Sequence, residues 1–361
     1  MQKFLCIFLL GFTAFTFSQD KDFSNAFKYV WALPNYPDSV LNVSHNKEVS
    51  GACPVFFPDS NSIFSRISVM QCDAEDNLYT YDVDYIRKFS PEGKMLFKKD
   101  MKDYSETGSG MSAQKNTFAI TSNGMMCFAE SGPSIGKGGR IVFLDSTGRL
   151  IKRININIVP GNIAIGTDSS VYVTGFNMLT QGPLIQHYSF NGEFLGAFCQ
   201  RDAVIKKNRM SGSSGRLFVN NNGNVYYAFS YPFRVGIFSS KGDSIKVTDR
   251  KVPGMKGATS AADRTILDNS LQRGIGIIDN KYIVVVSYLQ INKNDWNIDL
   301  YTIEGKYLNS IPSSVLPQSF FFKSWTFDSK GNVYFNIETY KGHAVIKYKL
   351  NLPKNIIAPN L

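Results

Sequence analysis

The stretch "SKGNVYFNI", residues 329–337, nearly repeats "NNGNVYYAF", residues 221–229, earlier in the same chain. Aligning the whole sequence on this phrase finds six versions, spaced 46 to 57 residues apart. They are "EDNLYTYD" with Tyr79, "SNGMMCFA" with Met126, "DSSVYVTG" with Tyr172, "NGNVYYAF" with Tyr226, "NKYIVVVS" with Ile283 and "KGNVYFNI" with Tyr334. Internal repeats of about 20–50 residues are typical of propellers and solenoids.

A second phrase follows the first in five of the six units, and its pattern is that of a β-hairpin. It places Phe, Leu or Tyr four residues before a glycine, and an aliphatic residue three after it. The five glycines are Gly93, Gly148, Gly192, Gly242 and Gly305. Glycine adopts the positive φ of a tight hairpin turn at little cost. The phrase therefore predicts two antiparallel strands joined by a short turn.

A third apolar run precedes each first phrase, as in "RISVMQC", residues 66–72, and "GNIAIG", residues 161–166. Polar turn residues follow these runs, and no helical periodicity of useful length occurs. Each unit thus contains four strands, A to D. Six such units predict an all-β fold, a six-bladed β-propeller with four antiparallel strands per blade, because a closed ring leaves few sheet edges exposed.

The sixth unit lacks its final turn glycine, so another segment must complete its blade. The run "AFKYVWAL", residues 26–33, has strand composition and belongs to no repeat. We expect this N-terminal strand to pair with the last blade and close the ring. The alternative is a seventh blade built from residues 19–66.

The first 18 residues have the pattern of a secretory signal peptide. Lys3 precedes an apolar run from Phe4 to Phe17, and small residues stand before Gln19. This run is shorter than the roughly 20 residues that span a bilayer. We therefore expect residues 1–18 to be a signal peptide, residues 19–60 to carry the ring-closing strand, and residues 61–361 to form the propeller. The protein is expected to be exported, periplasmic or extracellular, and not membrane-spanning.

Four cysteines, Cys53, Cys72, Cys127 and Cys199, remain after removal of this leader. An exported protein can form disulfides, and Cys53 and Cys72 are near enough in sequence to pair. Buried free thiols are the alternative, because the cysteines lie in apolar, strand-like sequence without metal-ligand spacing.

The repeat resembles that of six-bladed propellers of the NHL-repeat and wider TolB-like class, in which a Gly-Asn-Val-Tyr strand precedes a phrase such as "FSPEGKML". The resemblance covers roughly residues 60–350. It implies a fold but not one activity, since such propellers include protein scaffolds, carbohydrate binders, lactonases and lyases. Related lactonases hold a metal with acidic residues of the inner strands, and the inner strands here offer no carboxylates in matching register.

The loops that join strands B to C and D to A share one face of the predicted ring, and this face is the expected binding surface. Counting back from the turn glycines places the start of each strand C there, and the ends of strand B lie nearby. Glu130 and Glu338 are expected at matching strand B positions. The candidate ligand-binding residues are Asp84, Tyr85, Glu130, Arg140, Tyr231, Arg234, Trp296, Glu338 and His343.

These residues favour an exported, non-catalytic protein that binds a protein or carbohydrate partner, without a cofactor or metal and as a monomer. The formal net charge is +10, and basic residues gather in two D-to-A connections, which suits an anionic partner or merely a solvated surface. These basic residues are Lys206, Lys207, Arg209, Arg250, Lys251, Lys256 and Arg264. No nucleic-acid-binding module is recognisable. The alternative function is a hydrolase or lyase acting on a sugar-derived or lactone substrate.

Overall fold

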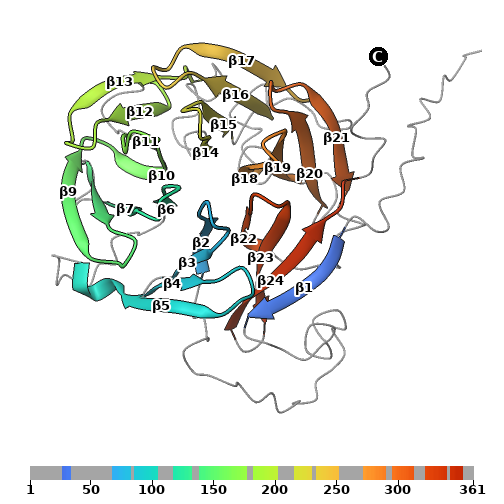
Figure 1. Ribbon diagram of the computed structural model, residues 1–361. Coiled ribbons are helices and arrows are strands. Elements are labelled where there is room, and N and C mark those ends of the chain that lie inside the picture. Colours follow the sequence, from blue (N-terminus) through green and yellow to red (C-terminus); the bar gives the residue numbers. More distant parts are fainter. Residues whose placement is uncertain are drawn as a thin grey trace, which may run out of the picture.

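The computed structural model describes residues 27–33, 67–82, 85–104, 117–131, 138–176, 182–201, 215–229, 233–251, 271–289, 295–312, 322–339 and 342–352. In these ranges the chain forms six antiparallel sheets of four strands each. The sheets are arranged as the blades of a ring around a central channel (Figure 1). The predicted all-β, six-bladed propeller is therefore confirmed.

Five blades run from the innermost to the outermost strand in chain order. Blade 1 comprises β2 (Ile67–Cys72), β3 (Leu78–Asp82), β4 (Tyr85–Phe89) and β5 (Met95–Asp100), followed by a 3-10 helix, Met101–Tyr104. Blade 2 comprises β6 (Thr117–Ile120), β7 (Met126–Ser131), β8 (Gly139–Leu144) and β9 (Leu150–Ile156). Blade 3 comprises β10 (Val159–Ile165), β11 (Val171–Phe176), β12 (Ile185–Tyr188) and β13 (Phe194–Phe198). Blade 4 comprises β14 (Arg216–Val219), β15 (Val225–Phe229), β16 (Arg234–Phe238) and β17 (Ser244–Asp249). Blade 5 comprises β18 (Leu271–Ile278), β19 (Tyr282–Leu289), β20 (Asp295–Thr302) and β21 (Tyr307–Pro312).

Blade 6 combines both ends of the described chain. Its inner strands are β22 (Phe322–Phe327), β23 (Asn332–Thr339) and β24 (Gly342–Leu350), and its outermost strand is β1 (Phe27–Leu33). β1 pairs antiparallel with β24, with Lys28 opposite Lys349. Figure 1 shows β1 along the outer side of β24. The predicted closure by an N-terminal strand is confirmed, and the seventh-blade alternative is wrong for this strand.

The first repeated phrase begins in the turn between strands A and B, and this turn is held by the side chain just before the phrase. Asp328 Oδ1 accepts a hydrogen bond from the Asn332 N–H at 2.8 Å, and Asn220 Oδ1 accepts one from the Asn224 N–H at 2.9 Å. Such Asx turns provide acceptors for backbone N–H groups that form no hydrogen bond within the sheet. Blades 1, 2, 4 and 6 share this side-chain-capped turn, whereas blade 3 has Gly166 at the equivalent position and blade 5 turns through Asp279 and Asn280.

The turn between strands C and D is built in the same way. The five glycines found in the sequence all have φ between 80° and 91°. Three residues before each stands Ser, Asp or Thr, and in blade 2 Asp145 Oδ1 accepts from the Arg149 N–H at 2.9 Å. In blade 3 the Ser189 hydroxyl accepts from the Glu193 N–H at 3.1 Å. The sequence pattern left this position unassigned, although a short polar side chain occupies it in all five units.

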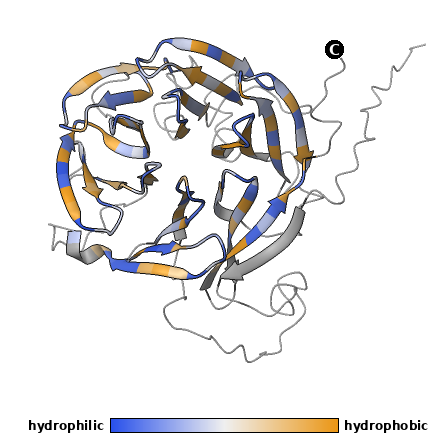
Figure 2. Ribbon diagram, viewed as in Figure 1, coloured by the Kyte–Doolittle hydropathy of each residue, from blue (hydrophilic) through white to orange (hydrophobic). Residues whose placement is uncertain are grey.

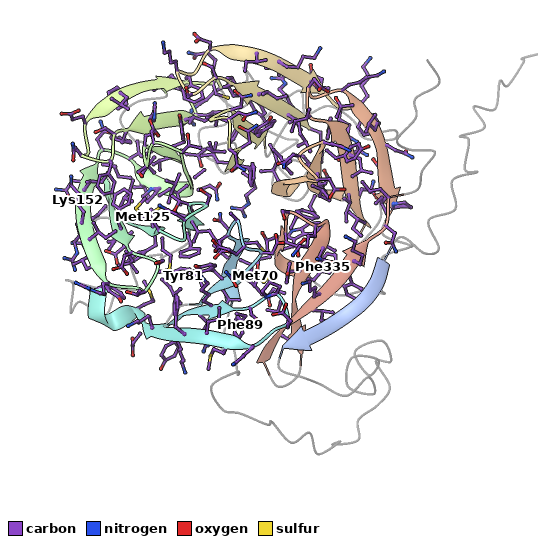
Figure 3. The ribbon with its side chains drawn as sticks, in the orientation of Figure 1. Met70, Tyr81, Phe89, Met125, Lys152 and Phe335 are labelled. Atoms are coloured by element: carbon purple, nitrogen blue, oxygen red, sulfur yellow. The ribbon has the colours of Figure 1, made fainter. Side chains whose placement is uncertain are left out.

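The core lies between neighbouring blades. Met70 of blade 1 and Phe335 of blade 6 belong to one buried cluster, and Tyr81 of blade 1 stacks on Phe118 of blade 2 with ring centroids 5.9 Å apart (Figure 3). Burying these faces supplies most of the favourable free energy of folding. Hydrophobic residues also reach the outer strands (Figure 2), where Leu195 and Ile245 are 52% and 55% exposed. The repeated aliphatic residue after each turn glycine is therefore largely a surface residue.

None of the helical structure in the described ranges is long and apolar enough to cross a bilayer.

Candidate functional site

The predicted binding face lies where β-strands A begin and strands B end, and we call it the loop face. Three described candidates, Tyr85, Arg140 and Arg234, stand there at equivalent positions, eight residues before their turn glycines. They come from β4, β8 and β16, in blades 1, 2 and 4. Each is partly exposed and makes contacts within its own blade. The rim of the loop face therefore carries side chains whose orientation is set by the sheet below them.

Arg140 is fixed by Glu130 on the neighbouring strand, directly opposite in register. Its Nη2 and Nε atoms lie 2.6 Å and 3.1 Å from Glu130 Oε2. The Glu130 side chain is 3% exposed and that of Arg140 is 19% exposed. A largely buried carboxylate of this kind needs its cation, so Glu130 positions Arg140 and presents little surface of its own.

Arg234 is held from two sides. Its Nε atom lies 2.5 Å from Asp249 Oδ1, and its guanidinium lies over the Phe229 ring, 5.5 Å from the centroid. Asp249 is 66% exposed, so this ion pair contributes little stability. It orients a planar donor group that is well suited to carboxylates and phosphates.

The Tyr85 ring lies between two cationic side chains. Lys98 Nζ is 4.0 Å from the ring centroid, and Arg87 Cζ is 4.9 Å from it. These contacts hold a flat aromatic surface at the start of β4.

The remaining rim candidates are less fully described. Asp84 and Tyr231 lie outside the described residues, and only the backbone is described for Trp296, Glu338 and His343. In the register of blade 6, Glu338 pairs with His343. In blade 2, Glu130 pairs with Arg140. At the same position of strand C, blade 6 has Ala344, which is one residue after His343. The expectation that the two glutamates occupy matching positions is therefore wrong, because Glu338 lies one residue beyond the strand B position equivalent to Glu130.

One of the basic residues expected in the D-to-A connections, Arg250, forms a buried ion pair. Arg250 Nη1 lies 3.0 Å from Asp299 Oδ2, and these side chains are 6% and 0% exposed. Ser287 and Ser310 donate hydrogen bonds to the same carboxylate. Burial raises the pKa of Asp299 above its ordinary value, against the opposing effects of Arg250 and the two hydroxyls. Arg250 thus links blades 4 and 5 and does not belong to a surface patch. Of the other basic residues in these connections only Lys251 is described; the rest, Lys206, Lys207, Arg209, Lys256 and Arg264, lie outside the described residues.

His187 packs within blade 3, in agreement with a structural role. Its ring stacks on Tyr172 at 4.2 Å between centroids, and its Nε2 atom lies 2.8 Å from the Ser170 hydroxyl. Burial lowers its pKa below the ordinary value, so the ring is neutral at pH 7. Within the described part of the chain, no three His, Cys, Asp or Glu residues gather as metal ligands.

The cysteines of blades 1 to 3 are free thiols, and Cys53 lies outside the described residues. Burial raises the pKa of Cys199 to about 12 and also raises that of Cys127. These two thiols are consequently uncharged and enclosed.

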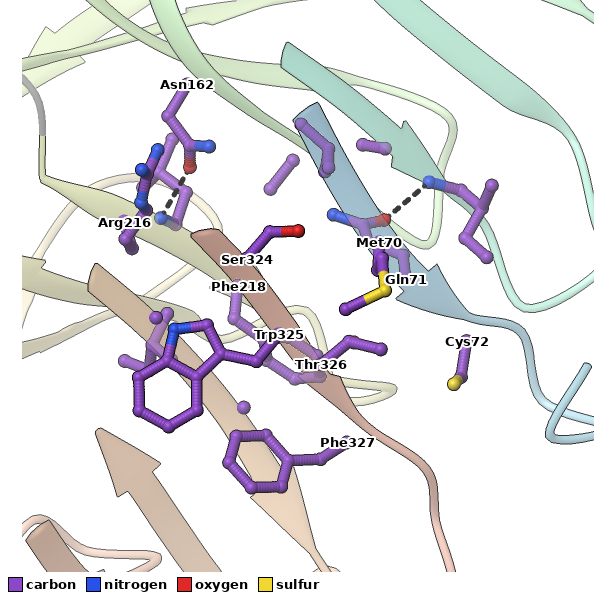
Figure 4. Close-up of a pocket in the computed structure, with 18 of the residues that line it drawn as sticks. Met70, Gln71, Cys72, Asn162, Arg216, Phe218, Ser324, Trp325, Thr326 and Phe327 are labelled. Atoms are coloured by element: carbon purple, nitrogen blue, oxygen red, sulfur yellow. Dashed lines mark hydrogen bonds between the residues drawn. The ribbon is translucent and has the colours of Figure 1, made fainter. Parts of the chain in front are cut away.

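The central channel is lined by residues of all six innermost strands and has a volume of about 160 Å³ (Figure 4). Sequence reasoning did not identify it as a site. Each innermost strand runs from the loop face toward the opposite, turn face. Near the loop face the lining includes Asn162, Arg216 and Ser324, whereas near the turn face it includes Ile165, Val219 and Phe327. The channel is therefore polar toward the loop face and mixed toward the turn face, where Gln71 and Thr326 stand among the apolar side chains.

Comparisons with known proteins agree with this architecture. A member of the DUF4221 family from Bacteroides vulgatus superposes with a TM-score of 0.56 at 9% identity, covering 82% of this chain and 95% of the other. A streptogramin B lyase gives a TM-score of 0.49 at 14% identity, covering 84% and 85%. A protein of unknown function from Bacteroides caccae gives 0.48 at 9% identity, covering 75% and 88%. No family model matches the sequence, and no curated protein does. At such identities the first likeness supports the propeller fold alone.

Proposed function

We propose that this protein is an exported six-bladed propeller that binds a protein or glycan partner through its loop face, without catalysing a reaction. The observation that supports this best is the rim of Tyr85, Arg140 and Arg234. Each of these side chains is held by neighbours in its own blade before any partner arrives. As part of the same proposal, the repeat phrases favour the NHL-repeat and TolB-like class.

Arginine and tyrosine are enriched among the residues that dominate binding energies at protein interfaces. A side chain that is already ordered loses less conformational entropy when a partner binds, which would otherwise cost about 0.5–1.5 kcal/mol per side chain. The rim therefore combines suitable residue types with a low entropic cost of binding.

The positive charge of the protein favours an anionic partner. The chain carries a formal net charge of +10, and two of the three rim side chains are guanidinium groups. Anionic groups on a protein or a polysaccharide would be attracted to this face and oriented by paired N–H donors. Export is proposed from the N-terminal sequence pattern, and we propose a monomer because the ring closes on itself.

The test is a comparison of retained partners with matched variants. The mature protein, residues 19–361, is immobilised and exposed to solubilised cell-envelope proteins and to purified acidic and neutral polysaccharides. Arg234→Ala and Tyr85→Ala should each reduce retention of the specific partner at least tenfold. Lys246→Ala, which removes an exposed cation from the outer strand β17, should leave retention unchanged.

Arg234→Ala is chosen over Arg140→Ala because it leaves no buried carboxylate without its cation. Equal retention by wild type, Arg234→Ala and Tyr85→Ala would overturn the assignment of the loop face. Turnover of a lactone or glycan by the wild type would overturn the non-catalytic role.

A further inference from the structure

Two side-chain amides in the channel have their orientation fixed by a neighbouring blade. Gln71 Oε1 accepts a hydrogen bond from the Ile120 N–H at 2.9 Å, and Asn162 Oδ1 accepts one from the Leu217 N–H at 2.8 Å (Figure 4). Because the oxygens are engaged, the NH₂ group of each amide is the end left for the channel. Neither NH₂ group has a protein acceptor among the described residues.

Two more polar groups line the same channel toward the loop face. Arg216 comes from the adjacent strand β14, and Figure 4 shows it beside Asn162. A guanidinium has five N–H donors, so it can serve a protein partner and a ligand together. The Ser324 hydroxyl of β22 is buried and has no hydrogen-bond partner within the described ranges. Between them β18 contributes Gly274, which has no side chain.

The charge of this lining is positive. The lining residues include Arg216 but no acidic side chain. The two amide NH₂ groups, the guanidinium and the Ser324 hydroxyl are all hydrogen-bond donors, and of these the Ser324 hydroxyl is buried without a partner in the described ranges. An anion that accepts several hydrogen bonds would match this set of donors.

Toward the turn face the lining also offers aromatic surface to an apolar group, beside the Gln71 amide. Phe218, Trp325 and Phe327 contribute aromatic surface to the lining. A Cβ atom on Gly276 would lie 2.8 Å from the Phe327 ring, so this glycine is required for the ring to sit where it does. The whole channel, which must hold both the carboxylate and the body, has a volume of about 160 Å³, similar to the about 150 Å³ of engineered cavities that hold benzene.

We propose that the channel binds a small monocarboxylic acid with an apolar, benzene-sized body, whose carboxylate accepts hydrogen bonds from Asn162, Arg216 and Ser324. The carboxylate lies toward the loop face, and the body lies between Phe218, Trp325 and Phe327. This site is separate from the rim of Tyr85, Arg140 and Arg234, so an experiment can refute one proposal without refuting the other.

The test uses phenylacetate as the probe, titrated calorimetrically into mature wild-type protein at pH 8. Phenylacetamide has the same body without the charge, and inorganic phosphate has charge without the body. Phenylacetate should bind at least tenfold more tightly than either. Equal binding of phenylacetamide would overturn the role of the carboxylate, and equal binding of phosphate would overturn the role of the apolar body.

The location is tested with nearly isosteric variants. Asn162→Asp keeps an oxygen for the Leu217 N–H and replaces the donor NH₂ group by a negatively charged oxygen, so affinity for phenylacetate should fall at least tenfold. Gln71→Glu makes the same change nearer the turn face. It tests the site even if Asn162→Asp does not fold. Asn224→Asp, on the turn face, is the matched control and should bind like wild type. Unchanged affinity in folded Asn162→Asp and Gln71→Glu would refute the site.

Discussion

Asp76 joins the first and last blades, and its substitution tests how the ring is sealed. Its Oδ1 atom accepts a hydrogen bond from the Ser329 N–H at 2.8 Å, and its Oδ2 atom lies 3.0 Å from Lys330 Nζ. Asp76 is 2% exposed and has φ of 63°, where blades 2, 4 and 6 place a glycine. The chain therefore accepts an unfavourable backbone conformation at the position from which a carboxylate can reach blade 6.

The magnitudes follow from these contacts. A hydrogen bond to a charged group contributes about 1.5–3 kcal/mol. A left-handed conformation costs a non-glycine residue about 1–2 kcal/mol. Asp76→Ala loses the bond and keeps the strain, so it should lower the free energy of unfolding by about 2–3 kcal/mol. Asp76→Gly loses the bond but relieves the strain, so the loss should be only about 1 kcal/mol.

The measurement is urea denaturation of each variant at pH 7, compared at constant slope. Ser169→Gly is the matched control, because Ser169 has φ of 65° at the same turn position in blade 3. It should stabilise the protein by up to about 1 kcal/mol. If Asp76→Gly behaves like Ser169→Gly, the carboxylate does not hold the two blades together.

The contribution of Asp76 to the free energy of unfolding should decrease as the pH falls. Burial opposes ionisation of Asp76, but hydrogen bonds from Ser329 and the charge of Lys330 outweigh it and hold its pKa below the ordinary value of 3.8. A lowered pKa stabilises the folded state above the unfolded pKa of about 3.9, and this contribution is lost as pH falls through the folded pKa. The difference between wild type and Asp76→Ala should therefore shrink steadily below about pH 4.

Two further outcomes are expected. Arg250→Ala leaves Asp299 buried without its cation and should lower the free energy of unfolding by about 3–5 kcal/mol in urea denaturation, and a loss below about 1 kcal/mol would show that the pair is not buried as described. Cys127 and Cys199, with raised thiol pKa values, should resist a thiol reagent at pH 8 until the protein is unfolded, and rapid labelling of either in the native state would contradict their burial.

The blades were predictable because their signals are local. A turn glycine and the apolar runs on either side of it lie within about a dozen residues and are repeated. Ring closure followed by elimination, since the sixth unit lacked a fourth strand and residues 26–33 had no other place.

The site was less predictable, because it depends on contacts between blades. The match of Glu338 with Glu130 failed because Met126 was aligned with Tyr334, whereas the turn glycines Gly124 and Gly331 align Met126 with Val333. Arg250 was assigned to a surface patch because its partner, Asp299, lies 49 residues later in another blade. The orientation of the Asn162 amide depends on the Leu217 N–H, which no spacing reveals.

The central claim is that an N-terminal strand closes a six-bladed ring, and cross-linking tests it most directly. Lys28 and Lys349 are paired across β1 and β24, and paired residues of adjacent strands have Cα atoms about 4.5–5.5 Å apart, a span that a disulfide bridges. Under mild oxidation, Lys28→Cys with Lys349→Cys should form a disulfide, seen as a linked peptide by mass spectrometry. The control, Lys28→Cys with Lys246→Cys of blade 4, should form none. A link in the control, or none in the first pair, would contradict closure by this strand.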